Sequence, residues 1–263
     1  MEPIFFREEK DKLYGVFHEC KGNDLNSGVI ICNPFGHEYM RAHRTLFTLA
    51  ENLSDLGFDV LRFDFLGCGD SSGELDQVSV ENWIGDIKSA IDLLRNSKQY
   101  STIYIVGNRL GATLAIQAAS LFKNITALVL WDPVTNGADY IKYLSNVHDE
   151  WLIQSFSSKN KSKLENEFIG FEINKKLLSG IANINLIDLK ELNIDKLLYI
   201  QTTPKVENID FQTLLKKQVT DYLFLHLPGN YGWKKQKDDD NNYVIPVEVI
   251  AHITNWIQKI SAE

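Results

Sequence analysis

The sequence predicts an α/β protein: a mostly parallel central sheet with helices on both faces and an inserted helical lid. Short apolar β-rich runs alternate along the chain with segments of helical periodicity, and this rhythm implies right-handed crossovers between parallel strands. The run at residues 28–32 is apolar without interruption, which is typical of a strand buried on both faces. With 263 residues, 44% of them hydrophobic, the chain suits one domain of ordinary size.

The first half of the chain supplies the beginning of this alternation. Residues 4–7 and 13–20 are expected to form an antiparallel pair ahead of the strand at 28–32. A helix is expected from about residue 42 to 56, because Leu46, Leu49, Ala50 and Leu53 recur at helical spacing and Gly57 marks its end. Three further segments are predicted in order: a strand at 58–65, a glycine-rich loop at 66–73 without the Gly-Lys-Ser/Thr ending of a phosphate loop, and a helix at 80–94.

The second half contains the predicted insertion. A strand at 103–106, a helix reaching residue 122 and a strand at 125–131 continue the rhythm, which breaks after Asp132-Pro133. Residues 135–195 have helical character, a polar interruption at 155–159 and no clear strand. We therefore predict a helical lid there and a core made of residues 1–134 and 196–263. The alternation resumes in the core with a strand at 197–201, a helix at 211–217, a strand at 222–227 and a helix at 246–260, and the charged loop at 234–242 is expected to be solvated.

Charge and composition exclude several classes of function. The formal net charge is -8 and no basic tract is present, so nucleic acid is not expected as a partner. No apolar leader or segment of membrane-spanning length is evident, which predicts a soluble cytoplasmic protein. Cys20, Cys32 and Cys68 are isolated and lack metal-ligand spacing, so we expect reduced thiols, no metal site and no cofactor.

A strand-to-helix turn at residues 107–111 carries the most informative pattern. These residues read Gly-Asn-Arg-Leu-Gly between an apolar strand and a helix of small residues. This is the outline of a nucleophile elbow, a sharp turn in which flanking glycines allow close backbone approach and the central side chain projects above the sheet. Arg109 stands where the serine belongs, and a permanently charged guanidinium cannot attack an ester carbon.

Several motifs together resemble the α/β-hydrolase superfamily over nearly the whole chain. They lie at residues 33–44, 61–65, 67–71, 109–112 and 130–134. In these motifs the chain is similar to serine-aminopeptidase-like and exosortase-associated hydrolases, relatives of which occur in polyketide and peptide natural-product clusters. Several of those relatives likewise carry arginine at the elbow. The resemblance implies an α/β-hydrolase fold, a small-molecule pocket and a role in biosynthesis, whereas ester hydrolysis does not follow from the fold.

The other two members of a serine triad are not recognisable by position. In this fold the acid should follow the strand at 197–201 and the histidine the strand at 222–227. Glu207 and Asp210 are only distant candidates for the acid. His226 falls inside a strand pattern and His252 inside a helix, so we expect both to be packed or on the surface. Loss of all three parts predicts that triad chemistry is absent.

Arg109 needs a negative partner, because a helix N-terminus already creates positive potential. One alternative is an internal carboxylate, with Asp132, Glu38 and Asp70 as candidates. The other is a ligand carboxylate or phosphate, which arginine binds in bidentate fashion. The two alternatives are compatible if a ligand competes for the same guanidinium.

Further residues are expected near the pocket. His37 and Glu38 are a possible acid/base pair at its mouth, and Arg41, together with His43 and Arg44, is a possible anion contact. Cys68 is a displaced nucleophile if its thiol pKa is lowered, and otherwise inert. Asp64 and Asp70-Ser71 are expected to brace their loop by hydrogen bonds to the backbone. The remaining expected ligand contacts are Phe35, Gly36, Asn108 and Leu110.

Three functions remain open from the sequence. The first is binding, without hydrolysis, of an acyl-type or anionic small molecule in a biosynthetic pathway. The second is hydrolysis or acyl transfer on an ester or thioester by Cys68 or His37 with Arg109. The third is docking to a carrier protein or a synthase through the lid, and the chain is a possible homodimer.

Overall fold

The computed structural model describes residues 1–7, 11–123, 125–155, 167–189, 191–229, 231, 233 and 244–263. Its centre is an eight-stranded sheet with the strand order β1-β2-β4-β3-β5-β6-β9-β10. The strands of this sheet are β1 (Glu2–Phe6), β2 (Leu13–His18), β3 (Ser27–Cys32), β4 (Asp59–Phe63), β5 (Thr102–Asn108), β6 (Ala127–Trp131), β9 (Lys196–Gln201) and β10 (Asp221–His226).

The sheet is parallel from β4 to β10, and only β1 and β2 run antiparallel to their neighbours. Strands β3, β5 and β6 at its centre are buried almost throughout, which explains their uninterrupted apolar sequences. The predicted fold class and the antiparallel start are confirmed. Because the strands are parallel, the loops that follow them meet at one edge of the sheet, as expected for a ligand site.

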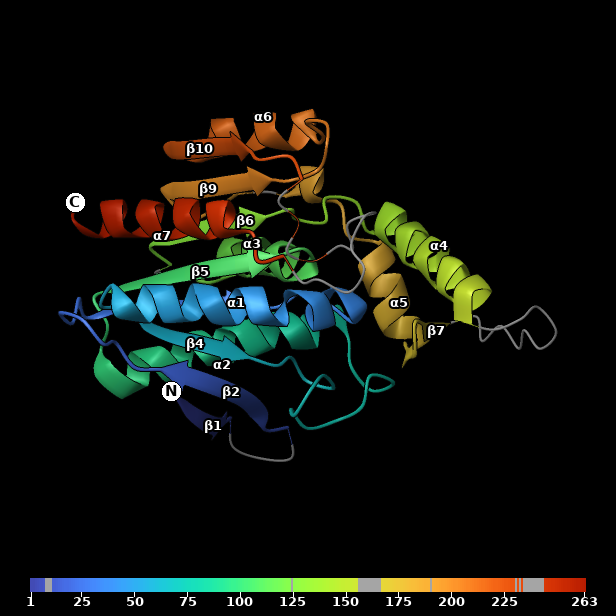
Figure 1. The fold of residues 1–263 in the computed structure, drawn as a ribbon, viewed down its shortest axis with the longest axis horizontal. Helices are drawn as coiled ribbons and strands as arrows, with labels where there is room; N and C mark the ends of the chain where they lie inside the picture. The colour runs from blue at the N-terminus through green and yellow to red at the C-terminus, as the bar shows by residue number, and fades with distance from the viewer. Residues whose placement is uncertain are drawn as a thin grey trace.

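Helices cover both faces of the sheet (Figure 1). Residues of α1 and α7 form one apolar cluster with one face, and residues of α2, α3 and α6 form a second cluster with the other. The bounds of these five helices are α1 (His37–Asp55), α2 (Val80–Lys98), α3 (Leu110–Leu121), α6 (Ile209–Gln218) and α7 (Val247–Ser261). No helix in the described ranges has the length and apolar character needed to cross a bilayer.

Two predicted helix boundaries differ from the structure. Helix α1 begins at His37, five residues before the expected start, because Gly36 with φ 59° turns the chain directly into the helix. Helix α2 continues to Lys98 rather than ending near residue 94. Its start is as predicted, and Ser79 and Asn82 form a capping box there.

The segment between β6 and β9 was expected to be helical without a strand, and this expectation is wrong in part. It contains α4 (Gly137–Ser155), α5 (Lys175–Ala182) and a single 3-10 turn η1 (Leu186–Asp188), but also the short antiparallel pair β7 (Glu167–Phe168) and β8 (Phe171–Glu172). The turn of this hairpin uses Ile169 and Gly170, both at positive φ. Strands of two residues are too short to produce an alternating pattern.

The segment lies beyond the arrowheads of the parallel strands, at the carboxyl edge of the sheet, where α4 and α5 stand beside each other (Figure 1). Residues 156–159 of the predicted polar interruption, and the predicted charged loop at 234–242, lie outside the described residues.

Candidate functional site

The turn between β5 and α3 has the geometry of the predicted elbow. Arg109 adopts φ 53° and ψ -124°, a strained conformation for a residue with a side chain, and its N–H donates to the carbonyl of Trp131 at 2.9 Å. A Cβ on Gly107 would lie 2.3 Å from Cα of Ala112. A Cβ on Gly111 would lie 2.3 Å from the carbonyl oxygens of Cys32 and Asn33. Both glycines are therefore required for the close approach of α3 to β3 and β5.

The side chain of Arg109 is paired inside the protein. Its Nε donates to Oε1 of Glu38 at 3.0 Å, and its Nη1 donates to the backbone carbonyl of Asp132 at 3.0 Å. The second oxygen of Glu38 accepts from the hydroxyl of Tyr140 at 2.8 Å. The Glu38 side chain is fully buried and that of Arg109 is 12% exposed. Of the internal partners expected for Arg109, Glu38 is the one that binds it.

Aromatic rings enclose the guanidinium. Its central carbon lies 3.8 Å from the ring centroid of Trp233, 5.6 Å from that of Tyr140 and 5.9 Å from that of Tyr143. Burial by itself lowers the pKa of Arg109, but the negative charges of Glu38 and Asp132 and the hydrogen bond to Glu38 raise it overall. Burial raises the pKa of Glu38, against which Arg109 and Tyr140 stabilise the carboxylate. We refer to Arg109, Glu38, Tyr140, Tyr143 and Trp233 as the arginine cluster.

Asp132 does not pair its carboxylate with Arg109, contrary to one of the expected alternatives. Its Oδ1 accepts from the backbone N–H of Thr202 at 2.7 Å, and its Oδ2 accepts from the Thr202 hydroxyl and from Nε1 of Trp233 at 2.7 Å. Asp70, the third expected partner, is exposed, and its N–H donates to Oδ2 of Asp64 at 3.1 Å. Burial raises the pKa of Asp132, which its hydrogen-bond donors and Arg109 oppose.

Trp233 follows β10, in the part of the chain where the fold would supply a histidine. The indole ring packs against the Arg109 guanidinium, and its Nε1 donates to the Asp132 carboxylate. His226 is instead the last residue of β10, and its Nε2 is 2.8 Å from the carbonyl of Thr203. His252 lies in α7 as predicted. The described residues thus place a cation and an indole at the two positions where a serine and a histidine were sought.

A cavity of about 310 Å³ adjoins the elbow at Leu110. Its walls are mainly apolar, and its polar side chains are those of Asn33, Tyr39, Asp64 and Cys68. The apolar lining comes from the β3–α1 and β4–α2 loops, from α2, α3 and β8, and includes Phe35, Phe65, Leu75, Trp83, Leu110, Leu114 and Phe171. An apolar cavity with few polar groups is the usual form of a small-molecule site.

The structure divides the predicted ligand contacts between these two places. Phe35, Gly36, Leu110 and Cys68 line the cavity, whereas Arg109 and Glu38 belong to the cluster. Asn108 is buried at the end of β5; its Nδ2 is 3.4 Å from the carbonyl of Trp131, and its Oδ1 has no hydrogen-bond partner among the described residues. Arg41 is half-buried on α1 and lines neither place.

His37 and Cys68 do not meet the conditions for activated groups. Burial, followed by the charges of Arg41 and Arg109, lowers the pKa of His37 to about 4, so this ring is neutral and weakly basic at pH 7. Burial, followed by Asp64 and Asp86, raises the pKa of the Cys68 thiol, although nucleophilic attack requires a lowered one.

The bracing role expected for the loop after β4 is confirmed. Asp64 receives the N–H of Asp70, and the hydroxyl of Ser71 donates to the carbonyl of Asp64 at 2.6 Å. Reasoning from the sequence missed Tyr140, Tyr143 and Phe171, which come from the insertion. It also missed Asn33 and Tyr39 as cavity residues, although both lie in the motif at 33–44, which signalled a site without indicating which side chains face it.

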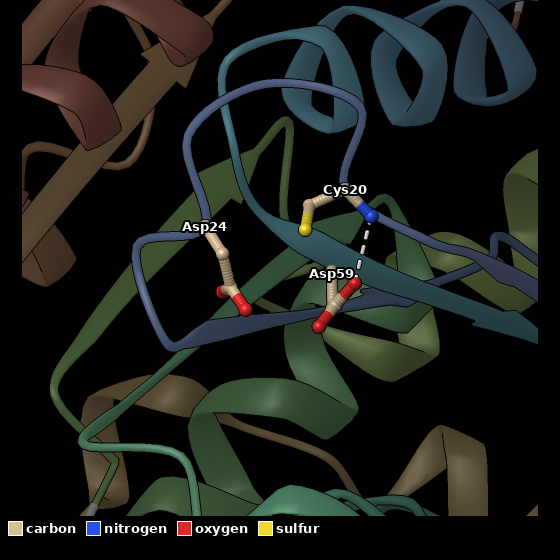
Figure 2. Close-up of side chains that lie close together, drawn as sticks. All are labelled: Cys20, Asp24 and Asp59. Atoms are coloured by element: carbon tan, nitrogen blue, oxygen red, sulfur yellow. Dashed lines mark hydrogen bonds between the residues drawn. The ribbon is translucent and has the colours of Figure 1, made fainter.

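A second polar group lies at the amino ends of the strands, away from the cavity. Cys20, Asp24 and Asp59 bring one sulfur and two carboxylates within 4.8 Å of one another (Figure 2). The sequence suggested that Cys20 is isolated, whereas the fold brings it beside two carboxylates. Lys98 forms ion pairs with both acids, its Nζ lying 2.5 Å from Asp24 and 2.9 Å from Asp59. The group connects the chain at Cys20 and Asp24 to the start of β4, and Lys98 supplies its cation.

Comparison with known proteins agrees with this geometry. A protein-family model described as the alpha/beta hydrolase fold matches residues 29–218. A segment of 99 residues is 31% identical to a monoglyceride lipase homolog of monkeypox virus and covers 37% of this chain and 36% of that protein. A segment of 71 residues is 37% identical to the mitochondrial palmitoyl-protein thioesterase ABHD10 of Bos taurus and covers 27% of this chain and 22% of that protein. The chain thus matches only about a third or less of these relatives' length.

Solved structures match over almost the full length. Est1E from Butyrivibrio proteoclasticus, in a structure with ferulic acid bound, superposes with a TM-score of 0.70, 17% identity and coverage of 99% of this chain and 100% of Est1E. The esterase Pf2001 of Pyrococcus furiosus gives a TM-score of 0.68 and 20% identity, with coverage of 98% and 90%. At these identities the likeness concerns the fold.

Proposed function

The chain belongs to the alpha/beta hydrolase fold family, and we propose that it binds an apolar, acyl-type small molecule in its cavity without serine-type hydrolysis. The observation that carries this proposal is the contrast at the elbow. An apolar cavity of about 310 Å³ lies next to Arg109, a side chain that cannot attack and is already bound to Glu38.

The chemistry of the cavity supports an acyl-type ligand. Phe35, Trp83, Leu110 and Phe171 offer apolar surface, and contact with an alkyl chain or a ring yields roughly 25 cal/mol for each Å² of apolar surface removed from water. The names of the relatives, a monoglyceride lipase homolog and a palmitoyl-protein thioesterase, likewise point to acyl groups. The anionic alternative has less support, because an anion would have to displace Glu38 from Arg109.

The proposed absence of hydrolysis rests on the groups that surround the elbow. In the described part of the chain, the position of the attacking atom is filled by Arg109 and the space beside it by Trp233. A lone neutral His37 and a Cys68 thiol with a raised pKa supply neither an activated nucleophile nor a strong base.

Binding and turnover of one small ester test the proposal. Hexyl acetate has a size that suits the cavity. We expect it to raise the melting temperature of the protein, by linkage to the folded state, while acetate release stays at the buffer rate. Substituting Leu75→Trp, which adds volume at the half-buried cavity wall, should abolish the thermal shift.

Two results would contradict the proposal. The first is the absence of any ligand-dependent shift in the unmodified protein. The second is acetate release above buffer that Leu75→Trp removes, which would make the protein a hydrolase. Cys68→Ala and His37→Ala would then show whether either group takes part.

A further inference from the structure

We infer that the cavity selects ligands whose apolar body carries a hydrogen-bond donor, such as a hydroxyl or an ammonium group, and discriminates against carboxylates. This inference rests on the proposed binding function and specifies the chemistry of its ligand. The juxtaposition that carries it is an acidic side chain, Asp64, in the wall of a cavity that no lysine or arginine of the described residues lines.

Asp64 is the charged residue of the cavity wall. Its side chain follows β4, the residue is 7% exposed, and the glycine-rich loop encloses it: a Cβ on Gly69 would lie 2.1 Å from Oδ2. Oδ1 accepts from the Tyr39 hydroxyl at 2.8 Å and Oδ2 from the N–H of Asp70 at 3.1 Å. Because each carboxylate oxygen accepts about two hydrogen bonds, Asp64 retains capacity for a further donor.

Asn33 lies in the same wall but does not offer its amide oxygen to the cavity. Its Nδ2 donates to the carbonyl of Phe63 at 2.7 Å, which fixes the orientation of the amide. Its Oδ1 is buried with almost no accessible surface, so a ligand in the cavity does not reach it. Of these two side chains, Asp64 is therefore the one that can accept a hydrogen bond from a ligand.

The cavity offers an anion no cationic side chain. No lysine or arginine is among the described residues that line it, and the nearby guanidinium of Arg109 is bound to Glu38. A carboxylate ligand would leave water for a site whose acidic side chain repels it. An alcohol or an ammonium group would instead be attracted by Asp64.

The size of the cavity determines which small molecules are suitable as test ligands. A volume of about 310 Å³ is at the small end of the roughly 300–1,000 Å³ that is usual for ligand sites, so small probes suit it. Aromatic walls such as Phe35 and Trp83, with ring centroids 5.6 Å apart, favour a phenyl ring. A matched series is therefore propylbenzene, 3-phenylpropan-1-ol, 3-phenylpropan-1-amine and 3-phenylpropanoate.

Calorimetric titration of the whole protein at pH 7 tests the inference. We expect the alcohol and the amine to bind at least tenfold more tightly than the carboxylate. In Asp64→Asn the preference for the amine over the carboxylate should fall at least tenfold. In the matched control Tyr39→Phe, which keeps the carboxylate and frees one of its lone pairs, the preference should be retained.

The outcomes separate the two claims. If no member of the series binds, the proposed function fails and the inference fails with it. If the carboxylate binds as tightly as the amine, the inference is overturned while binding itself stands. Should Asp64→Asn not fold, the order of affinities in the unmodified protein and in Tyr39→Phe still decides.

Discussion

The arginine cluster and the apolar cavity both adjoin one elbow, yet their polar groups are satisfied to different degrees. In the cluster, a buried cation meets a buried carboxylate, a tyrosine hydroxyl and three aromatic rings. In the cavity wall, Asp64 accepts one hydrogen bond at each carboxylate oxygen and has acceptor capacity to spare. Helix α1 serves both, because Glu38 binds Arg109 whereas the next residue, Tyr39, lines the cavity.

This difference separates stability from ligand binding at a single sheet edge. Groups that satisfy one another hold the fold together and have little left to offer a ligand, whereas unsatisfied groups in an apolar cavity are available for one. The arginine at the elbow is therefore best understood as part of the protein's internal packing.

Removing one partner of the ion pair should have the largest effect. Arg109→Met leaves the buried Glu38 without its counter-ion, which should lower the free energy of unfolding by about 3–5 kcal/mol. The double variant Arg109→Met with Glu38→Leu should recover much of this loss, because no uncompensated charge remains. Urea unfolding of the single and double variants measures the coupling. Losses in Arg109→Met and in Glu38→Leu that add up to the loss in the double variant would show that the pair is not energetically coupled.

The glycines of the elbow should come next. Gly111→Ala places a Cβ 2.3 Å from two backbone oxygens, so the start of α3 must shift, at a cost of about 1–3 kcal/mol or more. Gly85→Ala in α2 is the matched control, since nothing lies within 4 Å of its added Cβ, and it should stabilise the protein by about 0.5–1 kcal/mol. Thermal unfolding distinguishes the two. A Gly111→Ala protein as stable as Gly85→Ala would contradict the close approach at the elbow.

Filling the cavity should change binding more than stability. Leu75→Trp should weaken binding of 3-phenylpropan-1-ol at least tenfold, equivalent to about 1.4 kcal/mol, because the indole ring of the tryptophan occupies space that the ligand needs. The unfolding free energy should change little, since Leu75 is only half-buried. A substitution in the cluster, Tyr143→Phe, is the control that should leave the affinity unaltered. If Tyr143→Phe lost affinity and Leu75→Trp did not, the ligand would lie in the arginine cluster and not in the cavity.

The last effect is absent at neutral pH and should appear only in acid: a pH dependence due to His37. Burial, then Arg41 and Arg109, lowers its pKa from 6.5 to about 4 in the folded protein. The unfolded chain therefore binds more protons between these values, so His37 contributes stability that is complete above pH 6.5 and declines as the pH falls towards 4. The difference in unfolding free energy between His37→Gln and the unmodified protein isolates this contribution from other titrating groups. A difference that is constant from pH 7 to 4 would contradict the lowered pKa.

The sequence predicted the fold because its signals are local and repeated. The apolar run of β3 and the helical spacing of α1 can be recognised from neighbouring residues alone. The glycines at 107 and 111 likewise indicated the elbow. The internal partner of Arg109 was narrowed to three acids. Which of them binds depends on where α1 begins, and that in turn depends on the positive φ of Gly36.

The composition of the site could not be predicted in the same way. Tyr140 and Phe171 come from an insertion without a repeating pattern, and Trp233 is brought to Asp132 by a loop, so only the folded chain shows which ring faces which group. The pKa of Cys68 likewise depends on burial, on Asp64 and on Asp86. Of these two acids, only Asp64 is near Cys68 in the sequence. Long-range contacts of this kind leave no trace in local spacing.

The central claim is that the elbow carries a paired cation and no activated nucleophile. Intact-mass measurement after incubation with an alkyl fluorophosphonate, which bonds covalently to activated serine hydroxyls, tests it most directly. We expect the mass of the protein to remain unchanged at reagent concentrations that modify a serine esterase completely. A stoichiometric adduct on a residue of the cavity or the arginine cluster would contradict the account.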